Sequence, residues 1–190
     1  MPPQPNPQQF LDTALNALSA DADWRTVLDE LPVPIYTTDA KGKVTYWNRA
    51  CVDFAGRTPR LGEDRWCVTW RIFTTTGEFM PHDKCPMAQA VRQKQVIRDA
   101  VAIAERPDGS RRAFQPYPTP LFDDDGNLTG AVNMLIDVTE EQSEALAQQA
   151  GRCRRLAKAI YNRDTSTVLC DMAEQFERTA AELRSPESDA

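Results

Sequence analysis

Much of what would point to an enzyme is missing from this sequence. It contains one histidine, His82, and no GxSxG, P-loop, dinucleotide-binding glycine or HExxH pattern. A Ser-His or Cys-His pair would have to use that single histidine. The run Asp123–Asp125 lies between two strand-like segments and is followed by Gly and Asn, which is typical of a turn rather than of a calcium or phosphorylation site. We therefore expect no catalytic activity.

The chain also lacks a basic excess and any long apolar run. Its formal net charge of −6 argues against nucleic acid and anionic lipid, which attract basic surfaces. A short basic cluster at 152–158 follows several glutamates, so we interpret it as a solvated helix face. No segment approaches the roughly 18 apolar residues needed to cross a bilayer. We expect neither nucleic-acid binding nor membrane insertion.

Cysteine is scarce, and its spacing does not suggest a disulfide framework. The five cysteines form an odd count without a CxxC pair, and no N-terminal apolar segment follows basic residues. These features predict a reduced, cytoplasmic protein. The cysteines are Cys51, Cys67, Cys85, Cys153 and Cys170.

The 190 residues are enough for one domain with a core and some accessory helices. Residues 1–31 begin with a proline-rich and amide-rich stretch, which predicts a flexible tail up to Phe10. Apolar residues then recur at steps of three and four, and a second helical piece follows around Trp24. We therefore expect a tail followed by an N-terminal helical cap.

The middle of the chain changes to strand periodicity. Segments 33–39 and 43–47 are rich in β-branched and aromatic residues and flank a Gly-containing turn, which predicts a hairpin. Asn48 can cap a following short helix, and Gly56 can end it. A loop-rich stretch and a helix over 86–94 come next. Three more strands are predicted at Val96–Glu105, Ser110–Phe122 and Leu128–Val138, in antiparallel succession.

Three stretches together resemble a PAS sensory domain: PIYTTDAKGKVTYWN in the first hairpin, ERPDGSRRAF between the middle strands, and DDDGNLTGAVNMLIDVTEEQ at the last strand. The resemblance implies an α+β fold, a PAS-like five-stranded antiparallel sheet with short helices on one face. N-terminal helices and a C-terminal helical hairpin would flank it. It also implies bacterial-type signalling, with an acidic exit at 137–141 that passes a signal from the sheet into a helix. The PAS domain would span residues 32–139.

Helical spacing returns after the sheet, over residues 140–184, and a short tail at 185–190 is expected to be disordered. Asn162–Asp164 interrupts the pattern, and Asp164 can cap a second helix, so a helical hairpin is favoured over one rod. Each helix must bury its apolar stripe against its neighbour, the sheet or a second copy. The stripes are Leu146, Ala150, Cys153, Ala157 and Ile160 on the first helix, and Val168, Met172, Phe176, Ala180 and Leu183 on the second.

The stretch FMPHDKCPMA admits two interpretations. In the favoured one it starts a helix, with Asp83 or Cys85 as the cap and Pro86 in the first turn, where its missing N–H is harmless. In the other, His82 with Cys85 or Cys67 binds a metal or haem iron. Some haem-binding PAS domains carry their histidine on the corresponding helix, but His82 falls before it. Two ligands are also fewer than zinc sites use.

Flavin is not expected. Light-sensing PAS relatives use a cysteine within a stretch resembling Asn-Cys-Arg-Phe-Leu-Gln, whereas this chain offers NRACVDFAG and DRWCVTWRIF. Cys51 is better explained as a small apolar residue on a helix. The sequence therefore favours no cofactor, with haem as the alternative.

Ligand-binding candidates lie near the expected cleft between helices and sheet. Trp66, Trp70 and Arg71 could frame an apolar pocket with a cationic anchor, or both tryptophans could be core anchors. Asn133, on the last strand, needs a hydrogen-bond partner if it is buried. His82 and Cys85 complete the candidate set.

These observations predict a non-catalytic PAS sensor or adaptor. It would couple a small-molecule or redox input in the cleft to protein contacts through C-terminal helices, as a homodimer with a signalling partner. A ligand-free PAS dimerisation scaffold is the first alternative. A haem or metal redox sensor that uses His82 with Cys85 or Cys67 is the second.

Overall fold

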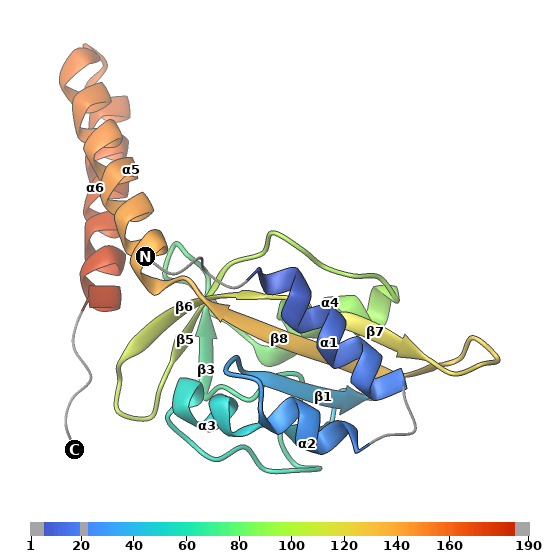
Figure 1. Cartoon of the computed structure of the whole chain (residues 1–190). Coiled ribbons are helices and arrows are strands. Elements are labelled where there is room, and N and C mark those ends of the chain that lie inside the picture. The colour runs from blue at the N-terminus through green and yellow to red at the C-terminus, as the bar shows by residue number, and fades with distance from the viewer. Residues whose placement is uncertain (1–5, 20–22, 185–190) are drawn as a thin grey trace.

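The computed structural model describes residues 6–19 and 23–184, so the predicted tails at 1–5 and 185–190 lie outside the described residues. Eight strands form one antiparallel sheet in the order β2-β1-β8-β6-β5-β3-β4, with β7 also paired to β8 (Figure 1). The predicted α+β fold class is confirmed. The strands are β1 (Ile35–Asp39), β2 (Val44–Trp47), β3 (Arg71–Phe73), β4 (Phe79–Met80), β5 (Ala102–Glu105), β6 (Arg111–Pro116), β7 (Thr119–Phe122) and β8 (Leu128–Asp137). The helices are α1 (Pro7–Ser19), α2 (Trp24–Asp29), α3 (Arg49–Ala55), the 3₁₀ turn η1 (His82–Lys84), α4 (Pro86–Gln93), α5 (Thr139–Ala159) and α6 (Arg163–Arg184).

Several predicted boundaries differ from the structure. The strand predicted over 110–122 is divided into β6 and β7, which pair with successive parts of β8. Pro116 and Pro118 flank the break, and proline has no N–H to donate to a neighbouring strand. The strand predicted from Val96 begins only at Ala102, because Asp99 has φ 61°, a conformation that strands do not use. α1 begins at Pro7 rather than near Phe10.

The edge hairpin of β3 and β4 was not predicted. These strands contain three and two residues, which is too short for alternation to be recognised in the sequence. With them, the sheet has more strands than the five that were expected.

Local signals around the first hairpin and α3 were predicted correctly. Gly42 adopts φ 81° in the turn after β1, and its N–H donates to the carbonyl oxygen of Asp39 at 2.9 Å. Asn48 caps α3 by accepting from the Cys51 N–H at 3.3 Å, and Gly56 ends that helix with φ 63°. Each feature depends on residues a few positions apart, which is why the sequence alone indicates it.

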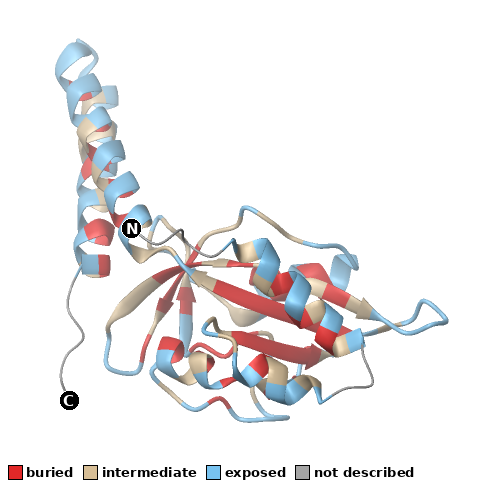
Figure 2. Cartoon of the chain, in the orientation of Figure 1, coloured by how far each residue is buried: buried red, intermediate tan, exposed pale blue. Residues whose placement is uncertain are grey.

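The sheet is covered on both faces. On one face, α3 and α4 pack over a core that includes Tyr36, Phe54 and Phe114, and we call this face the inner face. On the other face, α1 and α2 cover β1 and β8 through a separate cluster around Ile35 and Met134. Successive strand residues point to opposite faces, so the neighbours Ile35 and Tyr36 belong to different cores. Buried residues accordingly run along the central strands β1 and β8 (Figure 2).

On the face opposite the inner face, the base of the helical hairpin covers β5 and β6. Ile103 of β5 and Ala113 of β6 pack against Leu146, Ala180 and Leu183 of α5 and α6. Beyond this base the two helices run side by side away from the sheet (Figure 1). The hairpin therefore folds back on the core at one end and projects at the other.

The two predicted apolar stripes have different outcomes. Leu146, Ala150, Cys153 and Ala157 of the first stripe are buried, whereas Ile160 at its end is exposed. Of the second stripe, Ala180 and Leu183 are buried, Phe176 is half-buried, and Val168 and Met172 are exposed. A strict spacing of four residues drifts around a helix of 3.6 residues per turn, so Val168 and Met172 leave the buried face. Asn162, not Asp164, caps α6, because its side chain accepts from the Thr165 N–H at 2.9 Å.

Candidate functional site

A hydrogen-bonded chain crosses the inner core. The hydroxyl of Tyr36, on β1, donates to the carbonyl oxygen of Trp66 at 2.9 Å and accepts from Asn133 Nδ2 at 2.9 Å. Asn133 Oδ1 accepts from the Tyr117 N–H at 2.9 Å, at the break between β6 and β7. Tyr36 and Asn133 are fully buried, so these partners satisfy groups that water does not reach. The partners of the predicted Asn133 are thus protein groups.

This hydrogen-bonded network carries no net charge. Burial, with the nearby thiols of Cys67 and Cys85, holds the pKa of Tyr36 well above its usual value. The phenol therefore keeps its proton and remains a hydrogen-bond donor to the Trp66 carbonyl. Tyr36 links three segments that are far apart in the sequence: the loop at 66, β1 and β8.

Three thiols lie in the same core. Burial raises the pKa of Cys51, whose Sγ donates to the carbonyl oxygen of Ile35 at 3.2 Å. Burial also raises the pKa of Cys85 to about 12, and its Sγ lies 3.8 Å from the Trp66 carbonyl oxygen. Cys67 Sγ lies 3.2 Å from the hydroxyl of Thr69. A protonated, buried thiol is a poor nucleophile, so the environments of Cys51 and Cys85 do not favour thiol chemistry.

A surface pocket of about 570 Å³ opens beside this core. Trp66 forms part of its wall, and Arg65 and Arg92 lie over the indole ring at 5.9 and 5.4 Å from its centre. His82 and Asp64 also line it, and Asp64 is paired with the guanidinium of Arg57. We call this the Trp66–His82 pocket. Its lining residues are Glu63, Asp64, Arg65, Trp66, His82, Asp83 and Arg92.

His82 contributes an unusual group to this pocket. Its Nε2 is buried without a hydrogen-bond partner among the described residues. Burial and the nearby guanidinium of Arg57 lower the pKa of His82, against the opposing effect of Asp64. The imidazole is therefore neutral near pH 7.

The helix-start interpretation of the same stretch describes the backbone correctly. Cys85 occupies the N-cap position of α4 and Pro86 lies in the first turn. Neither predicted cap operates through its side chain, because no side chain bonds the first amides of α4. His82 lies in η1, before that helix. Within residues 6–19 and 23–184, no three His, Cys, Asp or Glu side chains are arranged to hold a metal ion, so Cys67, His82 and Cys85 do not form a ligand set.

Trp70 and Arg71 lie outside the pocket, which corrects the predicted frame of Trp66, Trp70 and Arg71. Trp70 is 40% exposed, and the Arg71 guanidinium lies 4.2 Å from the centre of its ring. Arg71 also pairs with Glu105 on the neighbouring strand at 3.4 Å. In β3 it is Ile72 that points into the core, so its neighbour Arg71 points out. Of the two tryptophans, only Trp66 packs against the core.

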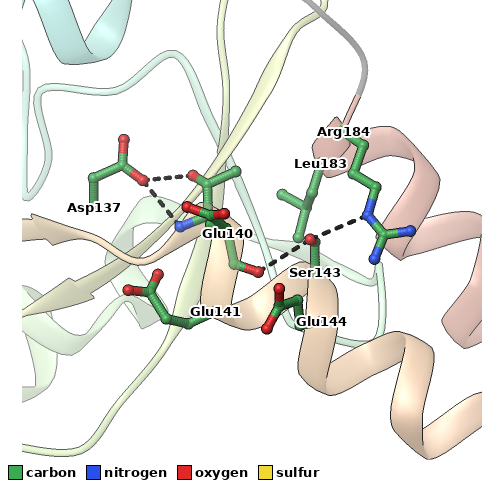
Figure 3. A pocket seen from close by; sticks show the side chains of 8 residues that line it. Asp137, Glu140, Glu141, Ser143, Glu144, Leu183 and Arg184 are labelled. Atoms are coloured by element: carbon green, nitrogen blue, oxygen red, sulfur yellow. Dashed lines mark hydrogen bonds between the residues drawn. The ribbon is translucent and has the colours of Figure 1, made fainter.

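The exit from the sheet is a second candidate site. Asp137 ends β8, and one of its oxygens accepts from the N–H and the hydroxyl of Thr139 at 3.0 and 2.6 Å (Figure 3). The Thr139 hydroxyl oxygen in turn accepts from the Ala113 N–H of β6 at 3.0 Å. Arg112 pairs with the other Asp137 oxygen at 3.3 Å. The first turn of α5 is therefore fastened to two strands.

The same junction holds the end of α6. An acidic pocket of about 560 Å³ lies between the first turns of α5 and the end of α6 (Figure 3). Arg184 Nε donates to the hydroxyl of Ser143 at 3.3 Å. Arg111 of β6 bridges Glu105 at 2.8 Å and Glu182 of α6 at 2.5 Å. A shift of β6 or β8 would therefore change contacts with both α5 and α6.

Sequence reasoning missed Tyr36, Arg92 and the contacts of Asp137 and Thr139 with β6. Tyr36 looked like an ordinary strand residue, although a polar-tipped aromatic next to two threonines was a usable signal. The others depend on contacts between distant segments, which a sequence pattern does not contain.

The chain belongs to the PAS fold family, whose pattern matches residues 28–143, more than half of its length. The predicted family is thereby confirmed, and with it a sensory type of domain. Comparison with curated proteins found no match. None of the helices in the described ranges is both long and apolar enough to cross a membrane.

Solved structures agree on the fold. An RNA-binding Light-Oxygen-Voltage receptor is 20% identical with a TM-score of 0.50, over 78% of this chain and 41% of that one. A Light-Oxygen-Voltage protein of Rhodobacter sphaeroides is 14% identical with a TM-score of 0.50, over 90% and 98% of the two chains. At these identities the likeness shows the fold alone. Because light-sensing proteins share the fold, the fold itself does not support the expectation that flavin is absent.

Proposed function

We propose that this chain is a non-catalytic PAS sensor or adaptor with its input in the Trp66–His82 pocket and its output in the helical hairpin. A bound small molecule would favour one arrangement of the loop at Trp66 over another. The hairpin would respond through a shift in the populations of these arrangements. The signal would leave by contact with a second copy and a signalling protein, in the cytoplasm, where its free cysteines stay reduced.

The observation that carries this proposal is the continuous connection from pocket to hairpin. Trp66 lines the pocket with its ring and bonds Tyr36 with its carbonyl oxygen. Tyr36 bonds Asn133, four residues before Asp137 on the same strand. Asp137 then fastens α5 through Thr139. A displacement of Trp66 therefore has a direct route to α5.

The pocket's chemistry suits a small molecule with a flat ring and one hydrogen-bonding group. The ring would stack on Trp66, beside the guanidinium groups of Arg65 and Arg92. Its polar group would pair with the neutral imidazole of His82, which lines the pocket. The expected ligand is therefore a ring compound that both stacks on Trp66 and pairs with His82.

Hydrogen exchange of backbone amides tests whether binding in the Trp66–His82 pocket changes α5. Native mass spectrometry of freshly purified protein would identify a retained molecule, and ligand-observed NMR with a panel of ring compounds would supply a probe otherwise. Bound probe should change amide protection in α5 residues 139–145. Tyr36→Phe should still bind the probe but transmit a smaller change. If no compound binds, or binding leaves α5 unchanged, the sensing proposal is overturned.

A ligand-free scaffold is the second candidate, and the packed inner core favours it. Side chains such as Tyr36, Phe54, Met87 and Phe114 are at most 4% exposed and pack on one another. A flavin ring or a haem would have to displace them, so these residues do not fit either group. Purified protein without visible absorbance, unchanged by added flavin mononucleotide or haemin, would agree with that fit. A stable dimer that binds no ring compound would favour the ligand-free scaffold over the sensor.

A further inference from the structure

The free end of the helical hairpin carries large apolar side chains that the described part of the chain leaves substantially exposed. Leu156 and Ile160 of the α5 end are 53% and 37% exposed, and Val168 and Met172 of α6 are 56% and 40% exposed. Tyr161 in the connecting turn is fully exposed. Exposed large apolar side chains that gather at one place mark an interaction surface rather than ordinary scatter.

These side chains share one face of the hairpin. Val168 and Met172 are four residues apart and lie along one side of α6. Leu156 lies in the last turn of α5, and Ile160 directly follows that helix. The opposite face carries Arg154 and Glu177, joined by two hydrogen bonds of 2.8 and 2.6 Å. With 3.6 residues per turn, Leu156 points away from Arg154 on α5, and Val168 and Met172 point away from Glu177 on α6. The hairpin therefore has one polar face and one apolar face.

Unpaired charges of opposite sign border the apolar face. The outer edge of α5 carries Arg152 and Arg155, and the outer edge of α6 carries Asp164 and Asp171. All four are exposed. Within the described residues, none of the four makes an ion pair inside the chain. One edge is therefore basic and the other acidic.

We propose that the occupant of this face is a second copy of the chain, with the two hairpins parallel and α5 of each copy packed against α6 of the other. A two-fold axis along the helices brings the basic edge of each copy beside the acidic edge of the other. An axis across the helices would instead place α5 on α5 and set like charges together. The parallel bundle therefore puts both PAS domains at one end. This orientation rests on the homodimer in the proposed function.

Sedimentation equilibrium of three charge variants at low salt tests the orientation. The α5 variant carries Arg152→Glu and Arg155→Glu, the α6 variant carries Asp164→Asn and Asp171→Lys, and the third carries all four changes. We expect either edge variant alone to raise the dimer Kd by about tenfold and the combined variant to return close to wild type. An α5-on-α5 dimer would leave all three near the wild-type Kd, because like charges already face each other. That result would overturn the parallel arrangement.

An apolar substitution tests the surface itself. Leu156→Ser should shift the protein to monomer, whereas Leu61→Ser, at a 58% exposed leucine outside the hairpin, should leave the dimer intact. Circular dichroism would check that every variant keeps its helices. A monomeric wild type, or a dimer unaffected by Leu156→Ser, rejects this surface. Probe-dependent exchange in residues 139–145 is measured separately, so either proposal can fail while the other stands.

Discussion

At the scale of single residues, the Tyr36 hydroxyl joins β1, β8 and the loop at Trp66 through one atom. Its hydroxyl is the shared partner of the Trp66 carbonyl and the Asn133 amide, all in the interior. A buried polar group left without a partner loses the free energy of hydration that it had in the unfolded chain. The hydroxyl is therefore important for stability as well as for the proposed coupling.

Tyr36→Phe removes that hydroxyl while keeping the ring. We expect the free energy of unfolding to fall by about 1–3 kcal/mol, because the Trp66 carbonyl and the Asn133 amide lose a buried partner. Chemical denaturation followed by circular dichroism measures this. Tyr161→Phe is the matched control, since Tyr161 is fully exposed, and its stability should not change. Equal effects of the two substitutions would contradict the role of the network.

His82 is expected to make folding stability depend on pH. Its pKa is lowered in the folded state from an ordinary value of 6.5, so the unfolded chain binds the proton more readily. The stabilisation from neutral His82 is therefore complete above that value and is lost as pH falls through it. Denaturant midpoints should decline between about pH 7.5 and pH 5.5 in wild type and less in His82→Gln. Parallel profiles of the two proteins would show that His82 is not responsible.

At the scale of elements, the first hairpin supports the pocket wall. Gly42 has φ 81°, and a Cβ placed there would lie 2.3 Å from the Trp66 ring. The Trp66 N–H also donates to the Gly42 carbonyl oxygen at 2.8 Å. The turn between β1 and β2 therefore determines where one wall of the pocket stands.

Gly42→Ala should be more damaging than its backbone conformation alone explains. Gly126 is the control, because it has φ 79° and open space around it. Gly126→Ala should cost about 1–2 kcal/mol from the left-handed backbone. Gly42→Ala should cost at least about 1 kcal/mol more and should shift tryptophan fluorescence, because the Trp66 ring must move. Equal losses of stability would mean that the ring contact is unimportant.

At the scale of the whole molecule, the sheet and the hairpin meet at Thr139. Its hydroxyl oxygen accepts from β6 through the Ala113 N–H, and its own proton goes to Asp137 at the end of β8. The base of the hairpin is further held by Arg111 and by buried Leu146 and Leu183. Polar and apolar contacts therefore join the sheet to the base of the hairpin, as the proposed coupling requires.

Thr139→Val should loosen this joint and leave the PAS core intact. The Ala113 N–H and Asp137 lose a partner, so we expect amides in the first two turns of α5 to exchange about tenfold faster, as for the loss of one hydrogen bond. Amides of β1 and β8 should keep their protection. Thr167→Val is the matched control, since the Thr167 hydroxyl bonds only its own helix, at Arg163. Equal exchange rates in α5 for the two variants would show that the Thr139 hydroxyl does not fasten α5 to the sheet.

Much of the architecture followed from local sequence, and the site did not. The first hairpin, the Asn48 cap, the Gly56 helix end and the helical hairpin depend on residues within a turn or two of one another, so composition and spacing determine them. The prediction of five strands was wrong for two reasons. β3 and β4 are too short for alternation to be recognised, and prolines divide one predicted strand into β6 and β7. Alternation along β3 decided that Arg71 faces outward, and Trp70 precedes that strand.

The sequence by itself determined a strand-rich middle followed by two helices, because periodicity and capping act over short distances. Its resemblance to PAS domains indicated the family. Only the tertiary structure decided that Trp66 and His82 line one pocket while Trp70 faces outward. It also decided that Val168 and Met172 lie on an uncovered face. These outcomes depend on which segments pack together, and packing is settled by the shape and burial of the entire core rather than by any one stretch.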